Sequence, residues 1–358
     1  MPPVRRFLRQ LIYGRPRPPS HRIDRILAIR RNGIGDMVCA LPVLRGLKKA
    51  YPRASLTVLA SRENAEIARC CEAVDRVLVY PLGGGLPLRG RTWQSWRTAK
   101  ALRRMKFDIV VGISGSFSRL LAVMVYGTGA GKRVGTIPPE LASDPFYYTH
   151  FRIRPPGSRL HQIETGLEIL QALGIQGDPD AIGFRPPDAD LTAMDEWLRS
   201  KFAGGSGHEP IVWLHISNNR PESRWDPKRF KKLAERLLSE TNANLVIARA
   251  GRDRKAPVLP FRKILGDRAT WFENPSLLQF AAALSRAKVV VCGDGGVMHL
   301  GAAVGSRVVA LFSGTEPEIW RPRGREHVVL KRGETANQIS VDEVYQAVAR
   351  QLRSKARS

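Results

Sequence analysis

The sequence contains no apolar run long enough to cross a bilayer. Its longest uncharged stretches, such as Leu120–Gly131, fall well short of the about 18 apolar residues that a transmembrane helix needs. Hydrophobic side chains still make up 43% of the 358 residues, which is ample for a folded core. We therefore expect a globular protein of about two domains, neither disordered nor fibrous, without a transmembrane segment.

Cysteine is scarce as well. The four cysteines, Cys39, Cys70, Cys71 and Cys292, form no Cys-x-x-Cys motif, and an adjacent pair is not a usual structural disulfide. No spacing of His, Cys, Asp and Glu suits a metal site. We therefore expect a reduced, cytosolic chain without a bound metal ion.

Acidic residues are outnumbered, because 58 Lys and Arg stand against 32 Asp and Glu, which gives a formal net charge of +26. Residues 1–187 carry 30 basic and 13 acidic side chains (+17), and residues 188–358 carry 28 and 19 (+9). This charge favours an anionic partner, such as nucleic acid, a phosphorylated glycolipid or an acidic membrane face. Frequent use of arginine throughout the proteome is the alternative explanation.

Acid is absent from the first 23 residues, which hold six arginines. Residues 8, 11 and 12 are apolar and would share one face of a short helix flanked by these arginines, an arrangement that suits docking on an anionic bilayer. A disordered tail that ends in Pro16-Arg17-Pro18-Pro19 is the alternative. The apolar residues are too few for a signal peptide.

The rest of the chain alternates strand, loop and helix in two rounds, which is typical of parallel sheets wrapped by helices. The first round predicts strands at Ile23–Arg30, Leu56–Ala60, Val74–Tyr80 and Asp108–Ile113, and helices at Val43–Ala50 and His161–Leu173. The second predicts strands at Ile211–Ile216, Ala243–Ala250, Val289–Cys292 and Val308–Phe312, and helices at Phe230–Leu238, Leu277–Ala287, Val297–Val304 and Val341–Leu352.

The expected fold class is therefore α/β, with two Rossmann-like domains whose strands would direct their carboxyl ends toward a common cleft. The predicted parts are a basic tail (residues 1–22), a first domain (23–176), a linker rich in Pro, Gly and Asp (177–190), a second domain (191–340) and a C-terminal helix with a basic tail (341–358). The final helix is amphipathic and could pack back on the first domain.

A glycine loop, Arg30–Asp36, directly follows the first strand. Glycines there let backbone amides approach a ligand, and Asp36 would lie near the start of the next helix, within reach of a substrate. A Rossmann dinucleotide fingerprint is incomplete, because only Gly33-x-Gly35 is present. On spacing alone, the favoured role of Asp36 is that of a helix N-terminal carboxylate that stabilises the dipole.

A second glycine loop, Gly293–Gly296, also lies between a strand and a helix. Free N–H groups at that helix start suit a diphosphate, and His299, about one turn later, could add a hydrogen bond. The alternatives are a merely structural buried His299 and an Asp294 that only caps the helix.

Two further patterns resemble a metal site and a phosphate-binding loop, but neither is predicted to be one. Asp188-Ala189-Asp190 matches a metal motif of another glycosyltransferase architecture, but it precedes Leu191 and is more consistent with a helix cap. The segment from Gly127 to Lys132 resembles a phosphate loop, but Arg133 replaces the required Ser or Thr.

Three groups of residues carry a resemblance to a known family. The first group runs from Ile26-Leu27-Ala28-Ile29-Arg30 through Gly35-Asp36 and Leu41-Pro42-Val43-Leu44 to Tyr51-Pro52. The second group is Leu214-His215-Ile216-Ser217, followed by Ser223-Arg224-Trp225 with Phe230 and Leu233. The third group runs from Asp294 to Ala303 and continues with Val309 to Phe312 and Trp320. In this order, over residues 25–345, they resemble glycosyltransferase family 9, the lipopolysaccharide heptosyltransferases.

The resemblance implies a GT-B fold, with two Rossmann-like domains facing a central cleft, the acceptor on the first and the nucleotide sugar on the second. It also implies an inverting reaction that needs no metal and no cofactor. By this resemblance Asp36 is the general base for the acceptor hydroxyl. The acceptor contacts would be Arg30, Arg31 and Asn32, and the donor contacts would include Asp294, Gly295, Gly296 and His299.

One position departs from the family pattern. Ser223 stands where many members have a lysine that neutralises the donor phosphates, so we expect Arg220 or Arg224 to supply that cation. Ser217 and Ser223 are expected in the same donor site. Asp253 is a candidate for the acidic residue near the nucleotide, with a solvated charge as the alternative.

The sequence thus predicts a glycosyltransferase that moves a heptose, or a related sugar, from an ADP-sugar to a lipopolysaccharide core acceptor. Such an acceptor is anionic, so we expect a cytoplasmic protein in peripheral contact with the inner membrane, and no nucleic acid. Two rivals stay open: a GT-B nucleotide-sugar epimerase, and a basic nucleic-acid-binding protein, which the pI of about 10.8 would suit.

Overall fold

The computed structural model describes residues 15–81, 88–205, 208–249, 259–273 and 276–354. The chain divides into two compact units, Met1–Ile182 and Gly183–Ser358. The division falls inside the segment 177–190 that the sequence marks as a linker. The predicted tail helix around residues 8–12 lies outside the described residues.

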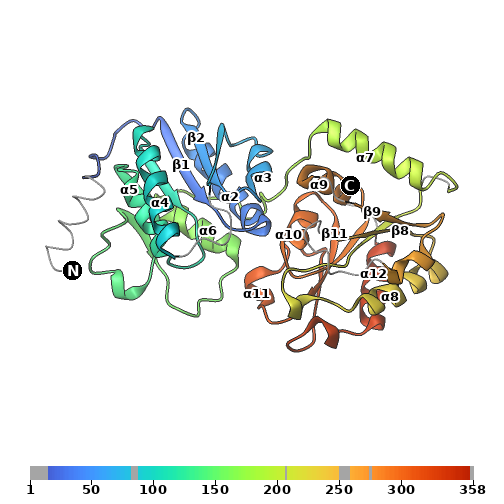
Figure 1. Ribbon diagram of the computed structural model, residues 1–358. Helices are drawn as coiled ribbons and strands as arrows, with labels where there is room; N and C mark the ends of the chain where they lie inside the picture. The colour runs from blue at the N-terminus through green and yellow to red at the C-terminus, as the bar shows by residue number, and fades with distance from the viewer. Residues whose placement is uncertain (1–14, 82–87, 206–207, 250–258, 274–275, 355–358) are drawn as a thin grey trace. The chain divides into compact units, whose positions relative to one another are not determined.

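The first unit is built on a six-stranded parallel sheet with the order β3-β2-β1-β4-β5-β6, of which β1 and β2 are labelled in Figure 1. Its strands are β1 Arg25–Arg30, β2 Ser55–Ala60, β3 Arg76–Val79, β4 Ile109–Gly112, β5 Lys132–Ile137 and β6 His150–Ile153. Its helices are α2 Ile34–Ala50, α3 Ala65–Arg69, α4 Leu88–Arg104, α5 Arg119–Gly127 and α6 Gln162–Gln171, with the 3-10 turn η1 Pro139–Leu141. The strand order reverses between β1 and β4, and ligands of such sheets bind outside the carboxyl ends of these strands.

The second unit repeats this plan with the strand order β12-β11-β10-β7-β8-β9, again all parallel. Its strands are β7 Ile211–His215, β8 Asn244–Ala248, β9 Ala269–Phe272, β10 Val289–Gly293, β11 Arg307–Phe312 and β12 Val328–Lys331. Its helices are α7 Asp188–Lys201, α8 Pro227–Glu240, α9 Leu277–Ser285, α10 Gly296–Ala303, α11 Pro317–Trp320 and α12 Val341–Arg353, with the 3-10 turns η2 Pro221–Ser223, η3 Leu259–Ile264 and η4 Ala336–Gln338.

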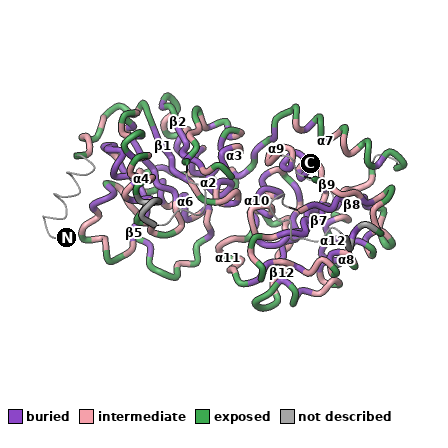
Figure 2. Tube along the Cα trace, viewed as in Figure 1, coloured by how far each residue is buried: buried purple, intermediate pink, exposed green. Residues whose placement is uncertain are grey.

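The central strands are buried on both faces, which explains why they read as continuous apolar runs rather than as alternating ones. In β1 every residue after Arg25 is buried, and Ile26 pairs in register with Leu56 of β2 and Ile109 of β4. Figure 2 shows the same contrast between buried strands and partly exposed helices in both units. The two parallel sheets confirm the predicted α/β class.

Helix α2 begins nine residues earlier than the sequence suggests. The expected helix started at Val43, after Pro42, because proline usually breaks a helix interior. In the structure Pro42 lies inside α2, which starts at Ile34, so that Gly35 and Asp36 belong to its first turn. The glycine loop is therefore shorter than predicted, and Asp36 is held by a helix.

The final helix packs within the second unit and not on the first domain. α12 contacts α8, and Val344 and Val348 belong to the core cluster that also contains Trp225. The Trp225 indole donates a hydrogen bond to the Ile339 carbonyl oxygen just before α12 (2.9 Å). None of the helices in the described ranges is long and apolar enough to cross a membrane.

Candidate active site

A buried arginine occupies the carboxyl end of β1. Arg30 is 4% exposed, and its guanidinium donates to the Asp36 Oδ1 atom (2.5 Å), to the Asp36 carbonyl oxygen (3.1 Å) and to the Ile113 carbonyl oxygen after β4 (2.9 Å). All three of these hydrogen bonds go to oxygen atoms of the protein itself. Arg30 therefore fixes the first turn of α2 against the sheet.

Both carboxylate oxygens of Asp36 accept hydrogen bonds, but the side chain stays partly accessible to solvent. Its Oδ2 atom accepts a hydrogen bond from the Gly33 N–H (3.1 Å), while Oδ1 receives the Arg30 guanidinium. One fifth of its side chain is exposed. The carboxylate thus stabilises the helix start, as the simpler alternative required, and still presents an accessible edge to a substrate.

The rest of this loop contacts the segments that follow β2 and β3. The Arg31 guanidinium lies over the Tyr80 ring at 4.5 Å from its centroid. Asn32 is exposed, and its carbonyl oxygen accepts from the Asn64 amide (2.8 Å) and from the Ser61 hydroxyl (3.0 Å). Asn64 is completely buried and was not predicted. It orders the loop that presents Asp36.

Further ionisable groups lie at the same edge of the first sheet. Burial inside α2 raises the pKa of the Cys39 thiol to about 12. The charges of Arg30, Asp36 and Glu164 also act on this thiol. Cys39 is therefore a neutral thiol and not a nucleophile. Glu164, in the first turn of α6, is a second carboxylate in this region that sequence reasoning missed.

In the second unit Asp294 is almost completely buried at the carboxyl end of β10. Its Oδ2 atom accepts a hydrogen bond from the Thr315 hydroxyl and lies 3.3 Å from the Arg220 guanidinium. Burial raises the pKa of the Asp294 carboxyl above its usual value, and Thr315 and Arg220 oppose that shift. The Arg220 side chain is 43% exposed, so it can also face a ligand.

Asn218 joins the predicted donor residues into one network. Its amide nitrogen donates to the Asp294 carbonyl oxygen (2.7 Å), and its amide oxygen accepts from the Arg220 N–H (3.0 Å). Its carbonyl oxygen accepts from the Arg224 guanidinium (2.6 Å). Asn218 therefore sets the positions of both arginines expected near the phosphates.

The loop around β10 packs so closely that it requires glycine. A Cβ atom on Gly293 would lie 2.6 Å from the Ser223 carbonyl oxygen and 2.8 Å from the Asn218 amide nitrogen. Ser223 itself is 1% exposed, and its hydroxyl is hydrogen-bonded to the Ser313 hydroxyl (2.7 Å). A direct contact between Ser223 and a donor stays a prediction.

Helix α10 starts beside Asp294 with two half-buried glycines. Gly295 is the N-cap residue and Gly296 the first helical residue, so backbone N–H groups of the first turn are available to an anion. His299 is buried, with its ring at 6.2 Å from Trp320 in an edge-on arrangement. These atoms are suited to a phosphate, as the sequence predicts.

Two more polar groups complete this edge. The Ser217 hydroxyl lies 3.1 Å from the His215 Nε2 atom, and burial lowers the pKa of His215 to about 4, so that its ring is neutral near pH 7. Lys331, at the end of β12, donates to the Thr315 carbonyl oxygen (3.0 Å) and lies 3.5 Å from Glu316. Lys331 is a cation that the sequence analysis did not identify.

The family model of glycosyltransferase family 9 (heptosyltransferase) matches residues 95–347 of the chain. The chain belongs to glycosyltransferase family 9. It is therefore a glycosyltransferase, the first of the three alternatives raised by the sequence. The matched range includes the Asp294 network but begins after Asp36.

Individual relatives agree with this family 9 assignment. Lipopolysaccharide heptosyltransferase 2 of Salmonella typhimurium is 22% identical over 355 residues, which cover 92% of this chain and 98% of the relative. The glycosyl transferase family 9 structure from Veillonella parvula has a TM-score of 0.78 at 19% identity and covers 94% of this chain and 99% of its own. The Escherichia coli heptosyltransferase WaaC with ADP has a TM-score of 0.68 at 20% identity, with coverage of 91% and 99%. The predicted GT-B fold is confirmed.

The residues predicted for the family 9 site divide into two groups, one in each unit. The β1–α2 loop brings together Arg30, Arg31, Asn32 and Asp36, and the β7, β10 and β11 ends bring together Ser217, Arg220, Ser223, Arg224, Asp294, Gly295, Gly296 and His299. Asp253 lies outside the described residues. Residues that were missed, such as Asn218, Thr315 and Lys331, are polar groups at carboxyl ends of strands, and that position alone would have identified them.

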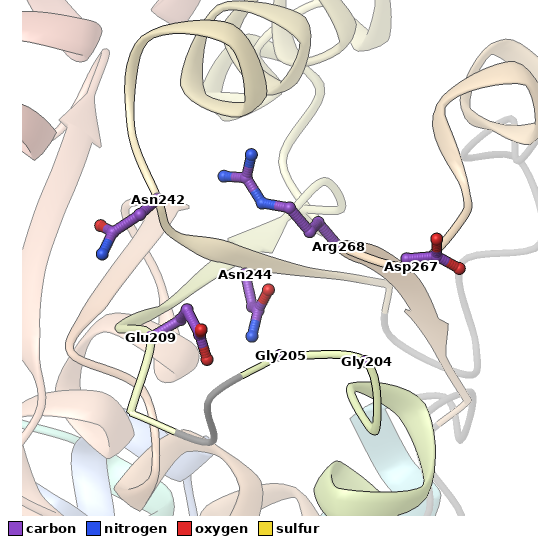
Figure 3. Close-up of a pocket in the computed structure, with 7 residues that line it drawn as sticks. All are labelled: Gly204, Gly205, Glu209, Asn242, Asn244, Asp267 and Arg268. Atoms are coloured by element: carbon purple, nitrogen blue, oxygen red, sulfur yellow. The ribbon is translucent and has the colours of Figure 1, made fainter.

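One hollow lies at the opposite edge of the second sheet and does not belong to this site. It has a volume of about 390 Å³ and lies at the amino ends of β7, β8 and β9 (Figure 3). Its Arg268 guanidinium is occupied by the carbonyl oxygens of Leu238, Thr241 and Ala243. In the described part of the chain, no group of three or more His, Cys, Asp and Glu residues could hold a metal ion.

Proposed function

We propose that this enzyme transfers a heptose from ADP-heptose to a lipopolysaccharide core acceptor, with inversion and without a metal ion. The observation that carries the proposal is the Asp36 carboxylate, oriented by Arg30 and Gly33 and still accessible on one edge. Relatives over most of the chain are heptosyltransferases, and one related structure holds ADP. An oriented carboxylate that can take a proton from a hydroxyl group is what direct sugar transfer requires.

The proposed reaction is a single displacement. The acceptor hydroxyl oxygen forms a bond to the anomeric carbon, its proton passes to Asp36, and the bond from that carbon to the diphosphate oxygen breaks with its electron pair. Attack opposite the leaving group inverts the anomeric configuration. The released ADP gains negative charge, which the α10 N–H groups, His299 and Arg220 would stabilise.

The donor is tested first. We expect isothermal calorimetry to show binding of ADP and ADP-heptose and at least tenfold weaker binding of UDP-, GDP- and CMP-sugars. A preference for a uridine or guanosine donor would overturn the ADP assignment. Release of free sugar without an acceptor would instead favour an epimerase-like reaction.

The base is tested with Asp36→Asn, which keeps the size of the side chain. We expect kcat for heptose transfer to fall about 10²- to 10⁴-fold, the usual range for loss of a general base, while the Kd for ADP stays within about twofold. Asp24→Asn is the matched control, because Asp24 is exposed at the opposite end of β1 and pairs with Arg22. Unchanged turnover in Asp36→Asn would remove Asp36 from this role.

We also propose that the enzyme works at the cytoplasmic face of the inner membrane, where its basic tail contacts anionic lipid. The support is the excess of arginine in residues 1–22 and the anionic character of a lipopolysaccharide core acceptor. Residues 15–22 include Arg17, which donates to the carbonyl oxygens of Phe107 and Gly129, so a deletion that leaves the fold intact stops at residue 14.

A further inference from the structure

One side of α4 forms an exposed cationic stripe around a tryptophan. Trp93, Arg97, Lys100 and Arg104 are spaced by four, three and four residues, so they lie on one helix face, and all four are exposed. Trp93 is 55% exposed, the most exposed large apolar side chain in the described ranges. The opposite face, which includes Ser95, Ala99 and Leu102, is buried against the unit. We call the exposed set the α4 stripe.

The charge of α4 has one sign. Residues 88–104 contain six Lys and Arg and no Asp or Glu. Among the described residues none of the three stripe cations is paired with a carboxylate; the Arg97 guanidinium lies 4.7 Å from the centroid of the Trp93 ring. Exposed cations without acidic neighbours favour an anionic partner.

The tryptophan narrows the chemistry of that partner. An exposed indole costs free energy in water, and Trp is enriched where a membrane meets water, because its ring is apolar and its N–H is polar. Binding of a soluble anion would require only the three cations and not an exposed indole. Trp93 among three cations instead fits the headgroup region of an anionic bilayer.

The described part of the N-terminal segment lies next to this helix. The Arg103 guanidinium, in the last turn of α4, donates to the Arg15 carbonyl oxygen (2.5 Å). Arg17 is fixed nearby through its N–H to the Gly129 carbonyl oxygen (3.0 Å). The described chain therefore begins, at Arg15, beside the end of α4, and the sequence that precedes it contains Arg5, Arg6 and Arg9.

We propose that the α4 stripe is a folded docking surface for an anionic phospholipid bilayer, and that it acts together with the adjoining basic tail. The inference deepens the membrane contact proposed above and does not depend on which sugar is transferred. Four side chains on one rigid helix would orient the first unit on the bilayer, whereas a tail alone would only tether it.

The test uses the full chain and vesicles of phosphatidylcholine with about one third phosphatidylglycerol. We expect Arg97→Gln, Lys100→Gln and Arg104→Gln combined to reduce partitioning about 100-fold, because each cation near an anionic surface contributes about fivefold. In the wild-type chain Trp93 should move to an apolar environment on binding. Trp93→Phe should remove that part of the blue shift in fluorescence.

A matched control carries the same loss of charge in the second unit. Arg199→Gln, Lys228→Gln and Lys232→Gln combined replace exposed cations on α7 and α8, and should leave partitioning within about threefold of wild type. Deletion of residues 1–14 in each background separates the tail from the stripe. If the stripe variant binds as tightly as the control, or if the wild type binds pure phosphatidylcholine equally well, the proposal is wrong.

A transfer assay with a water-soluble, delipidated acceptor separates this proposal from the proposed reaction. The stripe variant should keep the wild-type rate there, because α4 contributes none of the residues placed in the active site. A loss of transfer to the soluble acceptor would instead identify the stripe as an acceptor subsite and overturn the docking role. Loss of transfer in the wild type would contradict the reaction without affecting the vesicle result.

Discussion

At the scale of single residues, each of the two glycine loops uses a polar partner, buried Arg30 or partly buried Asn218, to hold a functional group in place. Arg30 fixes Asp36 in the first unit, and Asn218 fixes the main chain around Asp294 in the second. The sequence predicted that Arg30 contacts the acceptor. In the structure its guanidinium is hydrogen-bonded to protein oxygens, so Arg30 positions Asp36. Because Arg30 is buried, leaving its guanidinium without Asp36 would carry the full desolvation cost.

Gly293 tests how closely the donor loop must pack. Gly293→Ala should lower the free energy of unfolding by about 1–3 kcal/mol, because its Cβ would meet the Ser223 main chain, which cannot move like a flexible side chain. It should also weaken ADP binding, since the same shift displaces Asn218. Urea unfolding and calorimetry measure the two effects.

Gly314→Ala is the control for that experiment. Gly314 is exposed, and a Cβ there would have no atom within 4 Å, so we expect a change within about 0.5 kcal/mol. Equal destabilisation by both variants would mean that close packing at Gly293 is unimportant.

At the scale of elements, sequence periodicity located several buried strands and the amphipathic helix α12 closely, but it missed others, such as β5, α4 and α5. β1, β7, β10 and β11 were each predicted to within two residues at either end, because strands buried on both faces are continuous apolar runs. α4 was not predicted, since its composition is polar and basic and its helical spacing is clear only once its buried face is known.

α12 offers a test of an element's own start signal. The Ser340 hydroxyl accepts from the Glu343 N–H (3.2 Å), and the Glu343 carboxylate accepts from the Ser340 N–H (2.9 Å), which is a capping box. Ser340→Ala should cost about 1 kcal/mol of stability in urea unfolding. Ser239→Ala, an exposed serine inside α8, is the control, and an equal effect there would contradict a capping role.

At the scale of the whole molecule, the two units repeat one sheet plan with different polar groups at the strand ends. The first presents an accessible carboxylate, and the second presents cations and helix N–H groups around a buried carboxylate. This difference supports a division of labour in which the second unit holds the nucleotide.

Hydrogen exchange can test that division directly. ADP at about 100 times its Kd should stabilise the unit that binds it by about 2.7 kcal/mol. We expect protection of amides at the start of α10 and after β7, with the β1–α2 loop unchanged. Protection confined to the first unit would contradict the assignment of the donor to the second.

The sequence by itself determined the fold class, the family and the two glycine loops, because buried strands and glycine-containing turns are local patterns with a fixed order. Only the tertiary structure decided that Arg30 holds Asp36, that Asn218 joins two arginines to Asp294, and that Trp93 and three cations share an exposed face. These contacts depend on which side chains point inward, and that is set by the packing of elements far apart in the chain. The low content of acidic residues, at first a property of the whole chain, is most informative about function at α4, where a helix without Asp or Glu exposes its cations on one face.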